Sequence, residues 1–435
     1  MTTTVTAEDN APKVLISQAG RKGDPGTNGT NGDGFNQVRK SLLDNPLCHL
    51  FKTNKLVDTS APTSTDTDVT WNRSTSATYL DRYGVVKTAS INTPREEKEG
   101  FLIEGASTNL ARYSEQFDNA VWIKTGATVI TNNRTAPDGT ITGERITADG
   151  TTAIHGMYQT HTVSPSTTYN YSVFVEAGTE VEFFIYEGAL TGARGTFNLT
   201  LKTATTTQTG VTATIAELDS GWFRCTMTYT TGAAQASARF YNILGSTLGG
   251  VASNKFMWFW GAQAEQLSFA SSYIPTVGNA VTRTADLVNV SSTNNISLLN
   301  LDNTISFTCD TIGNNAPFNQ AIITSVATNT FSRTLMFWSG SDVVVLDYLS
   351  GFPYSYFATQ EDTNNIVSSY NAGSLISYVN GAQVFNSAAP YTDLAISSSL
   401  IIGSSGSSEF LFGHIKDLKI YDFALNANEA EYLSA

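Results

Sequence analysis

The sequence predicts an all-β protein: two antiparallel β-sandwich domains behind an N-terminal triple-helical neck, assembled as a trimer. Glycine recurs at every third position of residues 20–34, and most of the remaining chain consists of short runs in which apolar and polar residues alternate. Only 14% of the 435 residues are charged, well below the roughly 25% typical of soluble domains. Ser, Thr, Asn and Gly fill the gap, which favours short strands and tight turns over surface helices.

The composition also excludes several classes of partner. The formal charge of −13 opposes binding to nucleic acid. No apolar run approaches the roughly 18 residues of a spanning helix, so we expect a soluble chain without membrane insertion. Residues 1–10 are polar and acidic, unlike a signal peptide. The three cysteines, Cys48, Cys225 and Cys309, are far apart, which is typical of folding in a reducing compartment.

The neck is predicted from the glycine period alone. Only glycine fits where three chains meet at the axis of a collagen-like triple helix. The repeat places these five residues at the required spacing: Gly20, Gly23, Gly26, Gly29 and Gly32. At about 3.1 Å per residue the segment would form a rod of about 45 Å. We therefore predict a homotrimer, and the alternative is a flexible linker of Gly, Asn and Thr.

Two short segments flank the neck. Residues 1–19 are too few to bury a core, and we interpret them as a docking peptide, the alternative being a free tail. Residues 35–57 place Val38, Leu42 and Leu43 at helical spacing before Pro46. This pattern predicts a short helical connector that helps three chains to associate, or a single capping turn on the next domain.

Residues 58–290 form the middle region and carry an ordered set of motifs. The motifs in order are Ser-Ala-Thr-Tyr at 76–79, Asn-Thr-Pro-Arg at 92–95, Phe-Leu-Ile-Glu at 101–104, Thr-Asn-Leu at 108–110, Tyr-Ser-Glu-Gln-Phe at 113–117, and Trp122. Three later segments continue the pattern, at 171–178, 221–230 and 260–286. Together they closely resemble a module of bacteriophage tail-fibre and virion appendage proteins. The one departure is Phe101, where that family more often has Leu.

The periodicity of the middle region agrees with this resemblance. Val173 and Val175 alternate with their neighbours, as do the residues of 224–230, and such runs recur between Gly- and Asn-rich turns. The pattern predicts an antiparallel sandwich or jelly roll. Jelly rolls of this kind resemble carbohydrate-binding modules, so the resemblance implies sugar binding.

Residues 291–435 form a second β-rich region. Asn380-Gly381 lies between two alternating runs, which predicts a type I′ hairpin turn. The closing residues, with Ile402-Gly403, then Phe412-Gly413 and Ile415, then an alternating run to Tyr421, resemble the last strands of laminin-G and concanavalin-A-like lectin domains. Asn426 and Glu429 have the spacing of a capping box at the start of a final helix.

The motifs of catalysis are missing from the sequence. The four histidines are His49, His155, His161 and His414; each has a different local setting, and His414 is interpreted as structural. No nucleophile elbow, P-loop or zinc-protease motif occurs. We predict no catalytic residues, no cofactor and no metal site, and interpret Asp342, Asp347, Glu361 and Asp362 as solvated loop carboxylates. A glycosidase remains the alternative, because that chemistry needs only two carboxylates.

Sugar rings stack on Trp and Tyr side chains, so the candidate binding residues are aromatic. Outside the matched strands, four aromatic residues lie near predicted turns and are proposed as a carbohydrate platform: Trp338, Tyr348, Tyr354 and Tyr356. The alternative is that they pack loops onto the sandwich. Trp222, Trp258 and Trp260 lie in matched strands and are assigned to core packing.

Taken together, these features predict a non-enzymatic bacteriophage fibre or appendage protein, located in the virion and assembled in the host cytoplasm. Its N-terminal peptide would dock to a tail, collar or capsid protein, and its sandwiches would bind a host surface polysaccharide for adsorption, with three copies strengthening weak sites. The alternatives are a structural decoration of capsid or collar without a receptor, and a glycan depolymerase.

Overall fold

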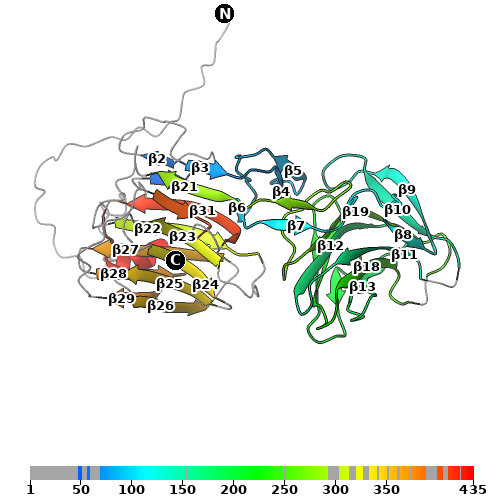
Figure 1. Cartoon of the computed structure of the whole chain (residues 1–435). Helices are drawn as coiled ribbons and strands as arrows, with labels where there is room; N and C mark the ends of the chain where they lie inside the picture. Colours follow the sequence, from blue (N-terminus) through cyan, green and yellow to red (C-terminus); the bar gives the residue numbers. More distant parts are fainter. Residues whose placement is uncertain are drawn as a thin grey trace, which may run out of the picture.

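The structure is a computed structural model that describes residues 48–50, 56–58, 69–151, 154–248, 251–291, 303–312, 320–326, 333–339, 342–349, 352–359, 363–371, 374–387, 399–404, 410–421 and 423–435. Within these ranges the regular structure is antiparallel β-sheet apart from one helix, α2 (Ala427–Ser434). The strands form two sandwiches that lie side by side (Figure 1). The all-β prediction with two antiparallel sandwiches is confirmed. Across the same residues no helix has the length and apolar character needed to cross a membrane.

The central sandwich consists of two six-stranded sheets. The first has the order β16 (Thr212–Glu217), β17 (Phe223–Thr230), β12 (Thr168–Ala177), β19 (Phe256–Glu265), β10 (Gly143–Ala148), β9 (Ala127–Arg134). The second has the order β15 (Thr203–Thr205), β14 (Arg194–Asn198), β13 (Glu182–Glu187), β18 (Ser237–Leu244), β11 (Gly156–Thr162), β8 (Ile123–Thr125). Alternate residues of each strand, such as Val173, Cys225 and Phe183, fill the core between the sheets.

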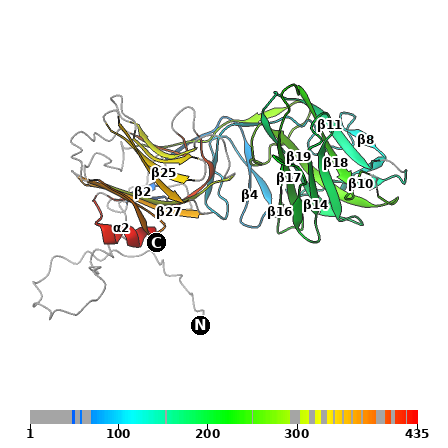
Figure 2. The same cartoon turned by 90° about the horizontal axis from the view of Figure 1, so that it is seen from below.

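The second sandwich, here called the outer sandwich, packs an eight-stranded sheet beside a seven-stranded one (Figure 2). The first contains β2 (Leu56–Asp58), β1 (Cys48–Leu50), β31 (Phe412–Tyr421), β22 (Asn303–Asp310), β27 (Thr363–Asn371), β28 (Ser374–Val379) and β29 (Ala382–Ser387), with β6 (Phe101–Glu104) also paired to β31. The second contains β26 (Phe352–Thr359), β25 (Asp342–Leu349), β24 (Arg333–Ser339), β23 (Gln320–Val326), β30 (Ser399–Ile402), β21 (Leu287–Ser291) and β3 (Val69–Asn72).

Four strands of the outer sandwich come from chain segments that precede the central sandwich: β1, β2, β3 and β6. For example, Glu104 of β6 is paired with Phe412 of β31, and Val69 of β3 with Val290 of β21. This pairing differs from the sequence-based division, because residues 69–72 and 101–104 join the outer sheets and the boundary placed at 290 falls inside β21. Local periodicity predicts a strand but not its distant partner.

Two two-stranded sheets connect the sandwiches. They are β4 (Ala77–Leu80) with β5 (Val86–Ala89), and β7 (Ser107–Asn109) with β20 (Val281–Arg283). Figure 1 shows β4, β5 and β7 between the two sandwiches. The connecting segments therefore carry the motifs at 76–79, 92–95 and 108–110 that mark the middle region in the sequence, and the motif at 101–104 is β6 of the outer sandwich.

Two local predictions in the outer sandwich are confirmed. Asn380 and Gly381 have φ angles of 50° and 76° and connect β28 to β29, as a type I′ turn requires. At the start of α2, the Asn426 side chain accepts a hydrogen bond from Glu429 N, and the Glu429 side chain accepts one from Asn426 N. The turn conformation and the helix cap are thus predictable from the types of a few neighbouring residues.

Several N-terminal predictions lie outside the described residues. They concern the docking peptide 1–19 and the neck 20–34 with Gly20, Gly23, Gly26, Gly29 and Gly32. Within the predicted helical connector 35–57, the described residues are strand: all of β1 and the first two residues of β2. Their backbone groups pair with each other, and β1 also pairs with β31. The helical spacing itself, at Val38, Leu42 and Leu43, lies outside the described residues, so the helix stays a prediction.

Asn109, from the motif at 108–110, fixes the connection between β7 and β19. Its amide nitrogen donates to the carbonyl oxygens of Ala262 (3.0 Å) and Ile274 (2.8 Å). Its amide oxygen accepts from the backbone N–H groups of Ala111 (2.9 Å) and Ala264 (3.0 Å). A buried side chain with every hydrogen bond satisfied holds the backbone around it in one arrangement.

A buried ion network lies at the junction of the two sandwiches. Arg95 Nη1 is 2.5 Å from Glu104 Oε2, and Arg95 Nη2 contacts Asp286. Arg73 Nη1 is 2.8 Å from Asp286 Oδ1, and Arg283 Nη2 is 3.4 Å from Glu104 Oε2. All five side chains are buried. The Arg of the 92–95 motif and the Glu of the 101–104 motif thus form an ion pair, which gives those motifs a physical role.

The carboxylate of Glu104 depends on this network for its charge. Burial by itself would raise its pKa, but Arg283, Arg95 and the hydrogen bonds from Ser272 outweigh that effect and lower the pKa to about 2. Ser272 N donates to Glu104 Oε1 at 2.8 Å. The ionised form of Glu104 is therefore bound more tightly in the folded protein than in the unfolded chain.

We predict an acid-sensitive fold. Because the pKa of Glu104 falls from 4.5 to about 2 on folding, its contribution is present above pH 4.5 and is lost as the pH falls towards 2. A shift of this size corresponds to about 3 kcal/mol at neutral pH. Glu104→Gln should lower the free energy of unfolding by about 3 kcal/mol and flatten its acid dependence, measured by denaturant titration.

The exposed Glu99 offers the control for this experiment. Glu99→Gln removes the same charge at the surface and should leave both stability and its pH dependence nearly unchanged. An acid transition in Glu104→Gln as steep as in the native protein would contradict the assignment.

Candidate functional site: a cleft between the sandwiches

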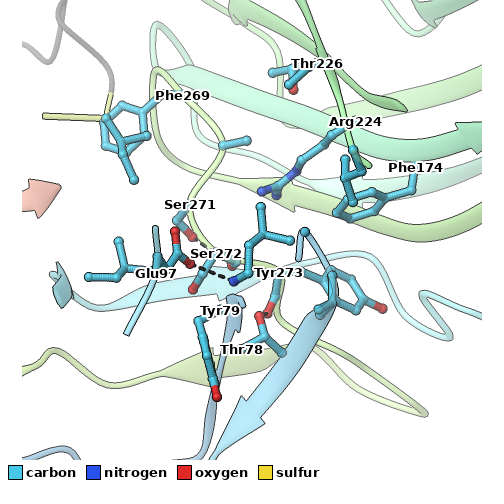
Figure 3. Close-up of a pocket in the computed structure, with 18 of the residues that line it drawn as sticks. Thr78, Tyr79, Glu97, Phe174, Arg224, Thr226, Phe269, Ser271, Ser272 and Tyr273 are labelled. Carbon is cyan, nitrogen blue, oxygen red and sulfur yellow. Dashed lines mark hydrogen bonds between the residues drawn. The ribbon is translucent and has the colours of Figure 1, made fainter. Parts of the chain in front are cut away.

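A cleft of about 690 Å³ lies where the outward face of the β17 sheet meets the connecting segments (Figure 3). Its walls come from residues 78–86 and 97–102, from β12, β16 and β17, and from residues 268–273, with Ile312 at one side. The volume is within the range of about 300–1,000 Å³ common for small-ligand sites. The cleft therefore forms only when segments distant in the sequence have assembled.

The floor of the cleft is the face of β16 and β17 that points away from the core. Residues directly opposite on two antiparallel strands share a face. The pairs on this face are Thr212 with Thr228, Thr214 with Thr226, and Ala216 with Arg224. The alternate residues Ile215, Cys225 and Met227 pack into the core. The two-residue period of each strand therefore gives a row of threonine hydroxyls that ends at an arginine.

Several of these hydroxyls are available to a ligand. Thr228 accepts a hydrogen bond from Asn170 (2.7 Å) and donates to the carbonyl of Ser268 (3.1 Å), so it is engaged. Thr212, Thr214 and Thr226 make no side-chain hydrogen bond to the other described residues. They can donate to or accept from the hydroxyls of a polar ligand.

Arg224 is the cation of the floor. Its Nη2 donates to Ser172 Oγ at 3.1 Å, and its guanidinium carbon is 5.3 Å from the centre of the Phe174 ring. Its Nε is buried and has no hydrogen-bond partner among the described residues. Burial lowers the pKa of Arg224, and the nearby negative charges of Glu265 and Glu104 only partly oppose this. Figure 3 shows the guanidinium pointing towards Ser271 and Ser272 across the cleft.

Two phenylalanines close the apolar parts of the cleft. Phe174 packs edge-on against Trp260, with ring centres 5.4 Å apart. Phe269 packs edge-on against Phe412 of β31 at 5.1 Å, so the outer sandwich supports this wall. Both phenylalanines are buried, with 2% and 7% of their surface exposed. They therefore limit the width of the cleft instead of forming an open stacking platform.

The serine-rich wall at 268–272 is held by a buried carboxylate. Glu265 accepts hydrogen bonds from Ser271 N (3.1 Å), Ser107 Oγ (2.6 Å) and Gln263 Nε2 (2.6 Å), and from the Ser271 hydroxyl. This network fixes the wall in position. Ser268 Oγ, in the same wall, is buried and lacks a hydrogen-bond partner in the described part of the chain.

One side of the rim is joined to the outer sandwich through His414 of β31. Its Nε2 is 3.0 Å from Glu97 Oε2, and its Nδ1 is 2.9 Å from Asp310 Oδ1. Glu97 also accepts from Leu80 N at 2.7 Å. Burial would lower the pKa of His414, but the hydrogen bonds and charges of Asp310 and Glu97 raise it to about 10. The imidazolium therefore joins two carboxylates from different parts of the chain.

Among the described residues, side chains of the types that bind metals lie close together at this part of the rim, around His414. Ligand atoms of Glu97, Glu99 and His414 lie within 4.8 Å of one another. A protonated imidazole that donates from both nitrogens has no lone pair for a metal, so a cation would first have to displace that proton. The absence of a metal site stays a prediction. The structural role expected for His414 agrees with its bridging position.

The four aromatic residues predicted from sequence lie away from the cleft. Trp338 lies in β24, Tyr348 in β25, and Tyr354 and Tyr356 in β26. These neighbouring strands end the seven-stranded sheet at one side. Their backbones are in strands, with Trp338 and Tyr348 each one residue before the end of β24 and β25. Their side chains are outside the described part, so the binding role stays a prediction.

The packing roles predicted for three tryptophans agree with the structure. Trp222 and Trp260 are each 1% exposed. Trp258 is only partly buried, and the Arg134 guanidinium lies 4.8 Å from its ring centre.

Sequence reasoning did not find the cleft residues. Arg224 is the one charged residue of β17, and with Thr226 and Thr228 it occupies the outward positions of that strand. This two-residue pattern was a usable signal for a polar outward face. No local pattern indicates that residues 78–86, 97–102 and 268–273 would fold over the same face, because these segments are separated from it by 40 residues of sequence between Thr228 and Ser268, and by more than a hundred for the first two segments.

Comparison with known families supports the fold of the outer sandwich. Residues 354–431 match the family described as the Concanavalin A-like lectin/glucanases superfamily. The match runs from β26 into α2. The predicted lectin-like fold of the C-terminal region is therefore confirmed for these residues. No curated protein matches the chain.

Several solved structures share a distant likeness. A CBM40 domain of a Ruminococcus gnavus sialidase bound to α2,3-sialyllactose is 13% identical, with 31% of this chain and 84% of that chain covered and a TM-score of 0.26. The binding domain of botulinum neurotoxin serotype D is 14% identical over 34% of this chain and 40% of that one, with a TM-score of 0.29. A heptameric pentraxin from Limulus polyphemus is 12% identical over 31% and 70%, with a TM-score of 0.26. These scores are too low to support a conclusion about ligands.

We predict that the rim loosens at alkaline pH. Because the pKa of His414 rises from 6.5 to about 10 on folding, its contribution is complete below pH 6.5 and is lost as the pH rises to 10. His414→Gln should lower the free energy of unfolding on the order of 3 kcal/mol at neutral pH and remove that slope, in calorimetry across this pH range.

His161 gives a matched control for this prediction. It is buried, but burial lowers its pKa to about 4, so it is neutral over the whole alkaline range. His161→Gln should keep the alkaline slope of the native protein. If the free energy of unfolding of His414→Gln still falls between pH 6.5 and 10, the contacts of His414 with Glu97 and Asp310 are not the cause of that pH dependence.

Proposed function

We propose that the protein is a non-enzymatic glycan-binding protein, and that the cleft holds a short stretch of a host surface polysaccharide. The observation that carries this proposal is the composition of one continuous surface. Free threonine hydroxyls on β16 and β17, the Arg224 guanidinium and the apolar edges of Phe174 and Phe269 face the same cleft of about 690 Å³. Sugars need this mixture of hydroxyl partners and apolar contact.

The match of residues 354–431 to the Concanavalin A-like lectin/glucanases superfamily supports a role in carbohydrate recognition. The motifs of the middle region, which resemble bacteriophage appendage modules, supply the setting. In this proposal the protein is a virion fibre used for adsorption, assembled in the host cytoplasm and docked through residues 1–19 to the tail, collar or capsid.

A cleft-filling substitution tests the location of the site. Ala216 is exposed and faces Arg224, so Ala216→Trp places a large side chain in the cleft at a strand position that tolerates aromatic residues. We expect affinity for a glycan identified on an array to fall at least about tenfold in isothermal titration calorimetry of the full chain.

Thr205→Trp is the matched control, because Thr205 is an exposed strand residue of β15 that does not line the cleft. Equal affinity in Ala216→Trp and the native protein would contradict the site. Loss of binding in Trp338→Ala instead would place recognition on the β24–β26 side of the outer sandwich. Release of reducing ends from the bound polysaccharide would indicate a depolymerase.

The proposed homotrimer has its own test. Three chains of 46.7 kDa should sediment as a species of about 140 kDa. Gly26→Arg places a side chain where a triple helix has no room and should weaken the trimer, measured by analytical ultracentrifugation over a concentration series. Thr30→Arg, at a position of the repeat that faces outward, is the control. A native protein that sediments as a monomer would contradict the proposal.

A further inference from the structure

Arg224 differs from the arginines of the buried ion network in its lack of a carboxylate partner. Arg73, Arg95 and Arg283 each have a carboxylate oxygen within 3.4 Å. No carboxylate of the described residues forms an ion pair with Arg224, whose one side-chain hydrogen bond goes to the neutral Ser172 hydroxyl. A guanidinium keeps its proton in proteins, so its charge persists and is not neutralised by a direct contact.

The position of Arg224 makes its charge accessible to a ligand in the cleft. Its neighbours across the sheet are Ala216 on β16 and Phe174 on β12. Ala216 is small and leaves room on one side, and the Phe174 ring supports the guanidinium on the other. Figure 3 shows its nitrogens directed into the cleft. Burial also disfavours an unpaired charge there, in agreement with a lowered pKa of Arg224.

Polar groups suited to sugar hydroxyls surround this charge. Thr226 and Thr214 occupy the next pair of positions along the same strands. Ser268 and Arg224 both line the cleft, and their Oγ and Nε atoms are buried without a hydrogen-bond partner among the described residues. A buried polar group without a partner destabilises the protein, so a ligand that satisfies it gains affinity.

The carboxylates around the rim limit which anions can enter. Three are engaged: Glu97 by His414, Glu217 by Lys202 at 2.6 Å, and Asp81 by the backbone N–H groups of residues 83 and 85. Glu99 and Asp219 are exposed at the outer rim together with Arg82 and Lys98, so the rim has no excess of positive charge to attract a densely charged chain. A ligand with a single, isolated negative charge fits this arrangement better than a sulfated or phosphate-rich polymer.

We propose that Arg224 recognises a carboxylate-bearing sugar, of the uronic or sialic acid class, within an otherwise neutral glycan; this inference rests on the proposed glycan-binding function. One guanidinium matches one carboxylate in charge and in its planar, two-point geometry. Thr214, Thr226 and Ser268 then bind hydroxyls of the same or the next sugar.

The ligand itself provides the first test. Oligosaccharides that contain uronic acid or sialic acid are compared with their carboxyl-reduced forms, which differ only in the missing charge, by isothermal titration calorimetry with the full chain. We expect the acidic form to bind about 10- to 100-fold more tightly, the range for one charged hydrogen-bonded contact. Equal binding of both forms would overturn the inference and leave the proposed function intact. Failure of every acidic and neutral glycan to bind would overturn the proposed function as well.

Three substitutions test the residue. Arg224→Met keeps the aliphatic stem and should lose the preference for the acidic form. Arg224→Lys keeps the positive charge without the planar, two-point geometry of the guanidinium, and should retain part of the preference for the acidic form. Arg239→Met removes an exposed charge from β18, outside the cleft, and should change affinity less than about twofold. An undiminished acidic preference in a folded Arg224→Met, verified by its melting temperature, would overturn the inference.

Discussion

The arrangement of the whole chain depends on burying oppositely charged side chains together. Arg95 and Glu104 lie at the junction of the sandwiches, and neither could be buried alone without a large loss of stability. Arg95 also donates from Nη1 to Ser272 Oγ (2.9 Å) and to the carbonyl of Thr78 (3.0 Å), and both of these residues line the cleft. The ion network and the cleft wall are therefore one structure. The network joins Arg73 and Arg95 of the connecting segments to the charges on β6, on β20 and just before β21.

A second constraint concerns the two faces of β17 in the central sandwich. One face of β17 supplies Cys225 and Met227 to the core, and the other face keeps polar residues although connecting segments cover it. A covered polar face must satisfy its hydrogen-bonding groups internally or leave them for a ligand. Thr228 is satisfied internally. Arg224 and the Ser268 hydroxyl are satisfied incompletely, which makes this face a candidate for recognition and not only for support.

The extent to which the sequence predicts the structure varies with the range of the interaction. The Asn380-Gly381 turn and the Asn426 cap follow from a few adjacent residues, and both were predictable. Strand alternation in β12 and β17 was predictable for the same reason. The placement of β3 and β6 in the outer sheets was not, because their partners lie hundreds of residues away or are set by the ion network. Arg224 was overlooked because a charged residue in the middle of a strand is informative only when the face that it occupies is known to be covered.

Because β6 and β21 flank the central sandwich in sequence but belong to its neighbour, the central sandwich is an insertion within the outer one. During synthesis on the ribosome the inserted unit can fold first, whereas β3 can pair only after β21 has been made, and β1 and β6 can pair with β31 only when the last strand is complete. The outer sandwich can therefore be completed only at the end of translation. Chains released before β31 is made would keep unpaired strand edges, which chaperones and proteases can bind.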